Sequence, residues 1–414
     1  MWALVLSVSS LSQVLGQTSL AVGFFFDGVA DVFGEFVDGD AAVLIEIASL
    51  AQALDETPCK SAMPATPALA FLRLLHGARG GEEGGAVFEV TAHLRFEGDV
   101  LAVLHGHRGA GRVVVRDPAG PGGMRVELFD DRRALLRLAQ LAIHLDRGVN
   151  ERGLQLNPQQ HLVPLWGVGD AAASFTAYLG EQVGAAEGDI LGFDVSLRDT
   201  QPAALLGRDG DLLASPRLDN LASCHAAVEA LLAAAVVDGG DCRPAIVLFD
   251  HEEVGSRSER GAASPLLGSI LERAAGGDRE DYWRALAGSV VASADMAHAT
   301  HPNYVEMAEP AHQGRMHGGP VLKVHRELRY ASDGRGIAAL RLAAEQADVP
   351  LQVFVSRSDL PCGTTIGPIT AGQLGVTTVD VGAPMLSMHS ARELTGVPDQ
   401  QAYAALLAAF LRPA

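Results

Sequence analysis

The chain has 414 residues and a formal net charge of −19, and this acidic balance argues against nucleic acid as a partner. Hydrophobic residues make up 48% of the chain, but no run reaches the 18 apolar residues typical of a membrane-spanning helix, so we expect no membrane partner. The length allows two domains and a sizeable core.

Residues 1–107 carry the weakest structural signal in the chain. A short strand at residues 86–90 is compatible with the pattern, but periodicity is weak throughout. No Lys, Arg or His precedes Lys60, although Asp and Glu recur, and folded surfaces normally mix both signs of charge. We therefore treat residues 1–107 as an atypical N-terminal segment.

From residue 108 the pattern sharpens, and residues 108–207 are predicted to form a smaller, β-rich domain. Residues 112–116 and 124–129 have strand patterns on either side of a turn, which predicts a hairpin. Apolar residues recur at helical spacing in residues 135–145. The Ala-rich residues 170–183 predict a second helix, and a further strand is predicted at 193–197.

Residues 208–414 alternate between strand and helix patterns. The helix at 219–236 starts with an acidic and an amide residue, as capping favours. The later elements are strands at 245–249, 289–293, 352–355 and 376–381 and helices at 264–273, 336–347 and 400–411. Such alternation predicts an α/β fold with a mostly parallel sheet covered by helices.

A charged loop follows the predicted strand at 245–249, in the stretch Ile-Val-Leu-Phe-Asp-His-Glu-Glu-Val-Gly-Ser. Glu252 and Glu253 are adjacent, and neighbouring carboxylates raise each other's pKa and cost stability. A metal ion would account for the pair, because one carboxylate can bind it and the other can take a proton from metal-bound water. The alternative is a solvated acidic turn, which the buried run before it and the residues downstream disfavour.

Further acidic and imidazole side chains lie close to the ends of other predicted elements. Asp295 follows the strand at 289–293, His389 follows the last strand, and Asp219 opens the helix before them. Ligands gather at the carboxyl ends of parallel strands, so these residues suit zinc or a related divalent ion, or two ions bridged by a carboxylate. Alone, each has a simpler interpretation, as a helix cap for Asp219, a turn residue for Asp295 and a loop histidine for His389.

Five segments resemble signature segments of the aspartyl aminopeptidase family of zinc exopeptidases. They are Arg-Leu-Asp-Asn-Leu at 217–221, Glu-Glu-Val-Gly-Ser at 252–256, Ser-Ala-Asp-Met-Ala-His at 293–298, Ser-Asp-Leu-Pro-Cys-Gly-Thr-Thr-Ile-Gly at 358–367 and Ser-Met-His-Ser at 387–390. The resemblance runs in order from about residue 109 to the C-terminus. It implies a zinc-exopeptidase fold at 208–414 with an inserted dimerisation domain at 108–207.

The resemblance also implies a role for each matching residue. Asp219 would bridge two zinc ions, Glu253 and His389 would complete the ligands of one, and Asp295 would serve the other; Co²⁺ or Mn²⁺ could replace zinc. Glu252 would be the general base. The positions that would hold substrate are His298, Lys323, Tyr330 and, from a neighbouring subunit, His144.

Two of these residues have simpler interpretations. Lys323 offers a cation for a substrate carboxylate and Tyr330 a hydroxyl donor for a developing oxyanion. From the residues alone, an exposed strand charge and a core tyrosine with its hydroxyl at the surface are the more common outcomes. The interpretation as substrate ligands depends on the family resemblance.

The first hundred residues depart from the family. The family carries a further metal-ligand histidine in an Ala-His-Thr-Asp segment, which the chain lacks. His93, His105 and His107 lie in this region without the acidic partner. The abrupt start of the resemblance and the missing basic residues favour a wrong reading frame or start site upstream over divergence. A site without this histidine should bind one metal more weakly.

We therefore expect a metal-dependent aminopeptidase that releases N-terminal, acidic residues from peptides, as a dimer-based oligomer or a dodecamer. The alternatives are a non-catalytic relative that keeps only the assembly surface, and a metallohydrolase of similar fold acting on another amide. The cysteines are spaced neither as a metal finger nor as a disulfide framework, which favours free thiols and a cytoplasmic location: Cys59, Cys224, Cys242 and Cys362.

Overall fold

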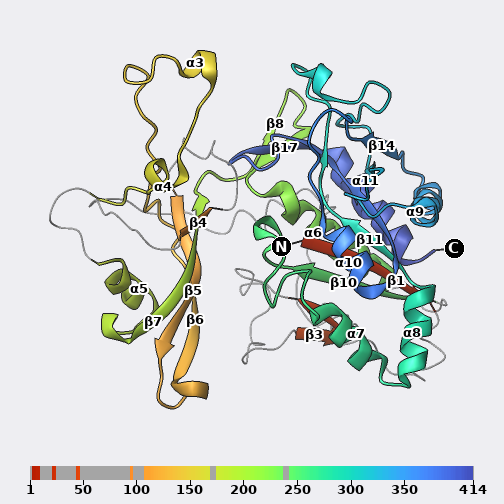
Figure 1. Cartoon of the computed structure of the whole chain (residues 1–414), viewed down its shortest axis with the longest axis horizontal. Helices are drawn as coiled ribbons and strands as arrows, with labels where there is room; N and C mark the ends of the chain where they lie inside the picture. The colour runs from red at the N-terminus through yellow and green to blue at the C-terminus, as the bar shows by residue number, and fades with distance from the viewer. Residues whose placement is uncertain are drawn as a thin grey trace, which may run out of the picture.

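The computed structural model separates into two lobes (Figure 1). It describes residues 2–9, 21–24, 43–46, 94–96, 107–167, 174–235 and 242–413. The strand expected at 86–90 and the histidines His93 and His105 lie outside these residues. No helix in the described ranges is long and apolar enough to cross a membrane.

The larger lobe contains a six-stranded sheet, which confirms the predicted α/β architecture. Its strand order is β10 (Cys242–Phe249), β1 (Trp2–Ser9), β11 (Val290–Ala294), β15 (Thr377–Gly382), β13 (Val321–Val324) and β14 (Gln352–Val355). The first strand, β1, is antiparallel to both of its neighbours, so β10, β11 and β15 run in one direction. The carboxyl ends of these three strands therefore meet at one edge.

The sheet is mixed, with fewer parallel neighbours than the sequence pattern predicts. Besides β1, β13 runs antiparallel to β15, and β14 is parallel to β13. A parallel neighbour needs a long crossover, usually a helix. Between β11 and β13 the described chain has only the short strand β12 (Ala297–His298) and the 3-10 turn η6 (Val305–Met307). Because no α-helix in this described stretch crosses over between these two strands, β13 can run opposite to β11 and β15.

Helices cover both faces of this sheet, because alternate residues of each strand point to opposite sides. In β10, Ile246 and Leu248 pack against a cluster shared with α6 (Leu218–Ala235), α9 (Gly334–Ala347) and α11 (Val397–Leu411). Ala245 and Phe249 pack on the other face, against α7 (Leu266–Ala275), α8 (Arg279–Gly288) and α10 (Ile366–Leu374). Each large apolar side chain buried this way contributes about 1.5–3 kcal/mol.

A second, smaller sheet crosses the edge where β11 and β15 end. Its order is β12, β16 (Pro384–Leu386), β17 (Glu393–Gly396), β9 (Leu212–Ser215) and β8 (Ala204–Leu206). Because β12 follows β11 closely and β16 follows β15, this sheet continues the same two chain segments past the edge. The loops of both sheets therefore converge there.

The smaller lobe contains a four-stranded sheet in the order β4 (Leu94–Phe96), β7 (Ile190–Asp199), β5 (His107–Arg116) and β6 (Met124–Asp130). Strands β5 and β6 pair as the predicted hairpin. The helix α5 (Phe175–Val183) packs its Tyr178 and Leu179 against Val113, Val115 and Val195. This lobe lies between β1 and β10 in the sequence, so it is inserted into the six-stranded architecture.

The remaining described elements are short. Near the end of the smaller lobe lie α3 (Val149–Arg152) and α4 (Pro158–His161), and β2 (Ala21–Phe24) pairs with β3 (Val43–Glu46). The domain boundaries at residues 107/108 and 207/208 stay predictions.

The helix predicted at residues 135–145 is wrong. Leu136 pairs with His107 and Arg137 with Leu165 in extended bridges, and residues 143–145 form a turn. Leu136 and Leu138 are each 4% exposed, so the buried residues here alternate with a period of two and not the helical 3.6. Apolar residues spaced four apart lie on one face in a helix and in a strand alike, and pairing with the neighbouring segments decides between the two.

Candidate active site

The loop after β10 is folded back on itself and presents Glu252 and Glu253. The Ser256 N–H donates to the His251 carbonyl over 2.8 Å, and His251 Nδ1 lies 2.7 Å from the Ser258 hydroxyl. Glu252 begins a 3-10 turn, η5 (Glu252–Val254). The residue before it, His251, has a φ of 58°, a left-handed conformation that is rare outside turns and functional sites.

Asp219 lies at the start of α6 and is 7% exposed. The next residue, Asn220, donates its side-chain N–H to the Ala294 carbonyl over 2.8 Å, which fixes the start of α6 to the end of β11. Both residues have non-helical backbone angles. The carboxylate of Asp219 accepts no capping hydrogen bond from a described residue, so the interpretation as a helix cap is not supported.

His389 lies in the turn between β16 and β17 and has a φ of 64°. Its Nε2 lies 3.0 Å from Asp219 Oδ2 and 3.4 Å from Glu253 Oε1. One potential ligand atom from each of these three residues falls within 4.8 Å of the other two. The hydrogen bond to Asp219 raises the pKa of His389 to about 9, with a further contribution from the charge of Glu253.

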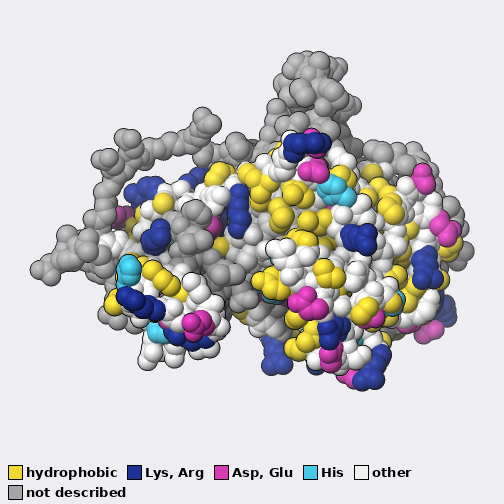
Figure 2. Space-filling view, turned by 90° about the horizontal axis from the view of Figure 1, so that it is seen from above, with side chains coloured by type: hydrophobic (Ala, Val, Ile, Leu, Met, Phe, Trp, Pro, Cys, Tyr) yellow, Lys and Arg dark blue, Asp and Glu magenta, His cyan; other side chains and the backbone are white. Residues whose placement is uncertain are grey.

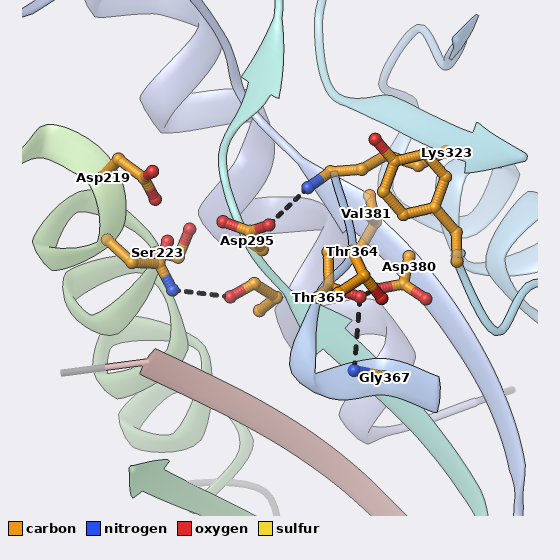
Figure 3. Close-up of polar contacts among 12 residues, drawn as sticks. Asp219, Ser223, Asp295, Lys323, Thr364, Thr365, Gly367, Asp380 and Val381 are labelled. Carbon is orange, nitrogen blue, oxygen red and sulfur yellow. Dashed lines mark hydrogen bonds and ion pairs between the residues drawn. The ribbon is translucent and has the colours of Figure 1, made fainter. Parts of the chain in front are cut away.

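Asp295 follows β11 and is held by a lysine. Lys323 Nζ donates to Asp295 Oδ2 over 2.7 Å, and both residues are almost completely buried. Figure 3 shows Asp219 and Asp295 directed toward the same space from α6 and β11, with Lys323 beyond them. The alternative interpretation of Lys323 as an exposed strand charge is therefore wrong.

The acidic residues at this site leave buried oxygens that suit a divalent cation. Asp219 Oδ1 and Asp295 Oδ1 are buried and accept no hydrogen bond from any described residue. Burial raises the pKa of Asp295, and the charge of Asp219 raises it further, while Lys323 lowers it. An unpaired buried carboxylate oxygen is costly, and zinc in proteins is bound by imidazole nitrogens and by Asp or Glu oxygens. The residues present therefore fit the metal that the sequence predicts.

Glu252 lies beside this cluster and is half-buried. Burial raises its pKa to about 7, and the charges of Glu253 and Asp219 add to the effect. A carboxylate with a pKa near neutrality can take up and release a proton during one reaction cycle.

Of the four predicted substrate positions, three lie in the larger lobe. His298 is exposed in β12, with its ring 6.1 Å from that of Phe354. Tyr330 is 5% exposed; Lys323 Nζ lies 5.5 Å from its ring centre, and Cys362 donates to its hydroxyl over 3.6 Å. The fourth position, His144, is exposed on a turn of the smaller lobe.

The described residues do not supply the histidine that the sequence lacks. His107 lies in β5 of the smaller lobe, is 2% exposed and belongs to the four-stranded sheet. Within the described ranges, the cluster of ligand atoms consists of Asp219, Glu253 and His389.

Two buried carboxylates at the site have no counterpart in the sequence prediction. Glu393, at the start of β17, is 2% exposed and accepts backbone N–H groups of two site residues. Asp380, in β15, is fully buried and accepts the Thr365 hydroxyl over 2.5 Å and the Ala331 N–H over 2.6 Å. A side chain on Gly367, in the first turn of α10, would collide with Asp380, which explains the glycine at this position (Figure 3). Glu393 begins a strand and Asp380 lies inside one, so the search for charged residues after strand ends did not find them.

Comparison with known proteins gives one consistent family. The profile of a family described as aminopeptidase I zinc metalloprotease (M18) matches residues 109–411. A probable M18 family aminopeptidase 2 from Streptomyces coelicolor is 50% identical over 311 residues, which cover 73% of this chain and 70% of the relative. The protein of the same name from Mycobacterium leprae is 51% identical over 307 residues with the same coverage.

Solved structures agree on the fold. The structure of an Ape4 and Nbr1 complex matches with a TM-score of 0.72 and 32% identity, over 80% of this chain and 67% of that one. The Saccharomyces cerevisiae mApe1 dodecamer matches with a TM-score of 0.62 over 80% of this chain and 74% of that one. At 22% identity, the second match shows the fold alone.

Proposed function

The chain belongs to the M18 family of zinc metalloprotease aminopeptidases, and we propose that it releases acidic N-terminal residues from peptides. The observation that carries the proposed site is the meeting of Asp219, Glu253 and His389, whose ligand atoms lie within 4.8 Å of one another. They come from three separate segments, so chance proximity along the chain does not explain the cluster.

In this proposal Asp219, Glu253 and His389 hold one zinc ion, and Asp219 with Asp295 holds a second; Co²⁺ or Mn²⁺ could take the same places. Zinc, when bound, lowers the pKa of a water molecule and polarises a carbonyl group. The buried Oδ1 atoms of Asp219 and Asp295 support the second position, because no described residue donates to them.

Glu252 acts as the general base. Its pKa of about 7 allows it to accept a proton from the attacking water and to pass that proton to the leaving amine. Glu253, the next residue in the turn η5, faces His389 instead: its Oε1 lies 3.4 Å from His389 Nε2. Two adjacent carboxylates thus have different tasks, one as a ligand and one as a proton carrier.

Lys323 provides the preference for an acidic residue. The chain uses arginine for nearly all of its 31 basic residues, and Lys323 and Lys60 are its only lysines. A buried ammonium group is a compact charge with three donors, so Lys323 can leave Asp295 and donate hydrogen bonds to a substrate carboxylate. Tyr330 and His298 complete the substrate positions, and His144 reaches the site of a neighbouring subunit.

The assembly proposed here is a dimer-based oligomer in the cytoplasm, with residues 108–207 as the contact domain. Large apolar side chains with at least 44% exposure are frequent on this lobe: Met124, Val126, Leu128, Leu141, Ile143, Leu145, Leu165 and Leu191. Figure 2 shows hydrophobic side chains exposed among scattered charges on the face seen from above. The matching mApe1 structure is a dodecamer, which supports a larger assembly as the proposal for this chain.

A non-catalytic relative is the second candidate, because the described part of the chain brings no further histidine to the cluster. A metallohydrolase acting on N-acyl amino acids is the third. A substrate panel separates them: amides of Asp, Glu, Leu and Arg, each with a free and an acetylated N-terminus, offered to the zinc-loaded full chain. We expect rapid hydrolysis of the free Asp and Glu amides. Preferred hydrolysis of the acetylated forms would support a deacylase, and zinc binding without any hydrolysis would support the non-catalytic relative.

A further inference from the structure

Glu393 lies between two segments that carry ligands of the proposed metal site. It begins β17, which pairs with β9 through Glu393 and Ser215 and with β16 through the residues that follow. The chain leaves β9 toward Asp219, and it leaves β16 toward His389. Glu393 therefore lies beside both connections.

Both oxygens of the Glu393 carboxylate are used for this contact. Oε2 accepts the backbone N–H of Asp219 over 3.0 Å, and Oε1 accepts the backbone N–H of His389 over 2.7 Å. Asp219 lies 174 positions away in the sequence, so a single side chain joins two distant segments. Glu393 is 2% exposed, which removes water as a competing partner for these bonds.

The chemistry of this contact requires a carboxylate. A carboxylate offers two acceptor oxygens, whereas the amide of glutamine offers one acceptor and one donor. A buried carboxyl group next to the carboxylate of Asp219 is costly, so its presence here needs an explanation. One explanation is that Glu393 fixes the backbone of two proposed ligand residues. Loss of a group that orients a metal ligand typically lowers metal affinity by about 10–100-fold.

We propose that Glu393 is a positioning residue that fixes the distance between Asp219 and His389 and so preorganises the zinc site. This inference rests on the proposed function in that it takes Asp219 and His389 to be metal ligands. The backbone of His389 is held in a left-handed conformation, which the bond from its N–H to Glu393 maintains. Glu393 does not contact substrate in this assignment.

The chain offers a closely matched control. Asp399, in the first turn of α11, is 1% exposed, and its two oxygens accept the backbone N–H groups of His317 (2.7 Å) and Gly319 (2.9 Å). Asp399 therefore makes the same kind of double contact, but neither of its partners is a proposed metal ligand. Glu393→Gln and Asp399→Asn remove the same chemical feature from two buried places.

The test compares the zinc dissociation constants of the full-length wild type, Glu393→Gln and Asp399→Asn by competition with a chelator. Alongside, the rise in Tm on adding zinc is recorded. We expect zinc binding to be about 10–100-fold weaker in Glu393→Gln and unchanged in Asp399→Asn. A variant that is only less stable has a lower Tm, but adding zinc raises its Tm as much as it raises that of the wild type. The same rise in Tm on adding zinc in Glu393→Gln as in the wild type would overturn the proposal.

Hydrogen exchange in the metal-free protein provides a readout that does not depend on zinc. We expect faster exchange in Glu393→Gln at the amides of Asp219 and His389, and wild-type rates there would contradict the assignment. If the wild type binds no zinc, the proposed function fails while the exchange result still decides the role of Glu393. If the glutamine variant does not fold, Glu393→Asp replaces it in the test. Aspartate keeps both oxygens, but its shorter side chain moves them away from the two N–H groups, so wild-type zinc affinity in Glu393→Asp would overturn the proposal.

Discussion

Charge at the site is balanced by two side chains in the metal-free protein. His389 lies between Asp219 and Glu253, and its raised pKa of about 9 means that it carries a proton at neutral pH. Lys323 neutralises Asp295 in the same way. To bind zinc, His389 must lose its proton and Asp295 must separate from Lys323. Zinc binding should therefore release protons from the protein, and zinc affinity should fall as the pH is lowered.

Glu252→Gln tests the assignment of the general base. The amide cannot accept the proton, so we expect kcat to fall by about 10²–10⁴-fold while zinc affinity stays close to that of the wild type. Steady-state kinetics and zinc titration check both parts. Glu259→Gln is the control, because Glu259 is exposed in the same loop; undiminished turnover in Glu252→Gln would remove Glu252 from this role.

Lys323→Met tests the buried ion pair. Removal of the lysine leaves Asp295 buried without a partner, so we expect the free energy of unfolding of the metal-free protein to fall by about 3–5 kcal/mol. Urea unfolding measures this change. Arg326→Met removes an exposed cation three residues along and should have little effect; equal losses in the two variants would argue against the pair.

The candidate ligand residues could be proposed from the sequence, because charged residues close to the ends of predicted strands and helices are visible in the residue order. Asp219, Glu253 and His389 meet as expected, although their roles stay proposals. Glu393 could not be predicted in this way. Its partners are backbone N–H groups, one of them 174 residues away, and no residue pattern encodes such a contact.

At the scale of elements, the strands of the larger sheet were predicted best. Strands β10, β11 and β15 are short runs rich in Val, Ile, Leu, Ala and Thr that lead into polar loops, so a strand could be predicted at each. The helices α8 and α10 were missed. The first is largely polar, and the second contains two glycines and a proline, so the local helix propensity of both is weak. These two helices form because Leu286 and Ile366 are buried against the sheet.

The smaller lobe depends on a buried polar network that should make it sensitive to acid. Asp131 accepts the Tyr178 hydroxyl over 2.7 Å and an Arg133 N–H over 2.6 Å. Burial alone would raise the pKa of Asp131, but these bonds lower it below its ordinary value. A lowered pKa in the folded state means that the network stabilises the lobe above about pH 4 and that this contribution is lost as the pH falls further.

The prediction is that the difference in Tm between the wild type and Asp131→Asn shrinks as the pH falls from neutral through about 4. Trp166 packs on Tyr178 with a centroid distance of 5.0 Å, so its fluorescence reports unfolding of this lobe. Asp194→Asn removes an exposed carboxylate from β7 and controls for the general effect of charge. A difference in Tm that does not vary with pH would contradict this role of Asp131.

At the scale of the whole molecule, the exposed apolar residues of the smaller lobe need a partner surface. Contiguous exposed hydrophobic patches mark interaction sites, and Leu145 is 75% exposed on the turn that carries His144. A second copy covering this turn would bring His144 close to another subunit. This arrangement would join assembly and activity in one contact.

The double variant Ile143→Asp, Leu145→Asp tests this contact. Buried charges oppose association, so we expect light scattering to give a smaller particle than for the wild type, with lower activity. Leu342→Asp on α9, where Leu342 is 65% exposed, is the control and should keep the wild-type mass. An unchanged mass for the double variant would place the contact elsewhere.

Zinc titration of the full-length metal-free protein, with hydrolysis of an aspartyl amide followed at each step, tests the central claim most directly. The account predicts that a chelator abolishes hydrolysis and that activity returns as zinc binds, up to two ions per chain. It also predicts that His389→Ala, which removes a ligand from the cluster, needs far more zinc for the same recovery. Full activity in the metal-free protein, or zinc binding that does not depend on His389, would contradict it.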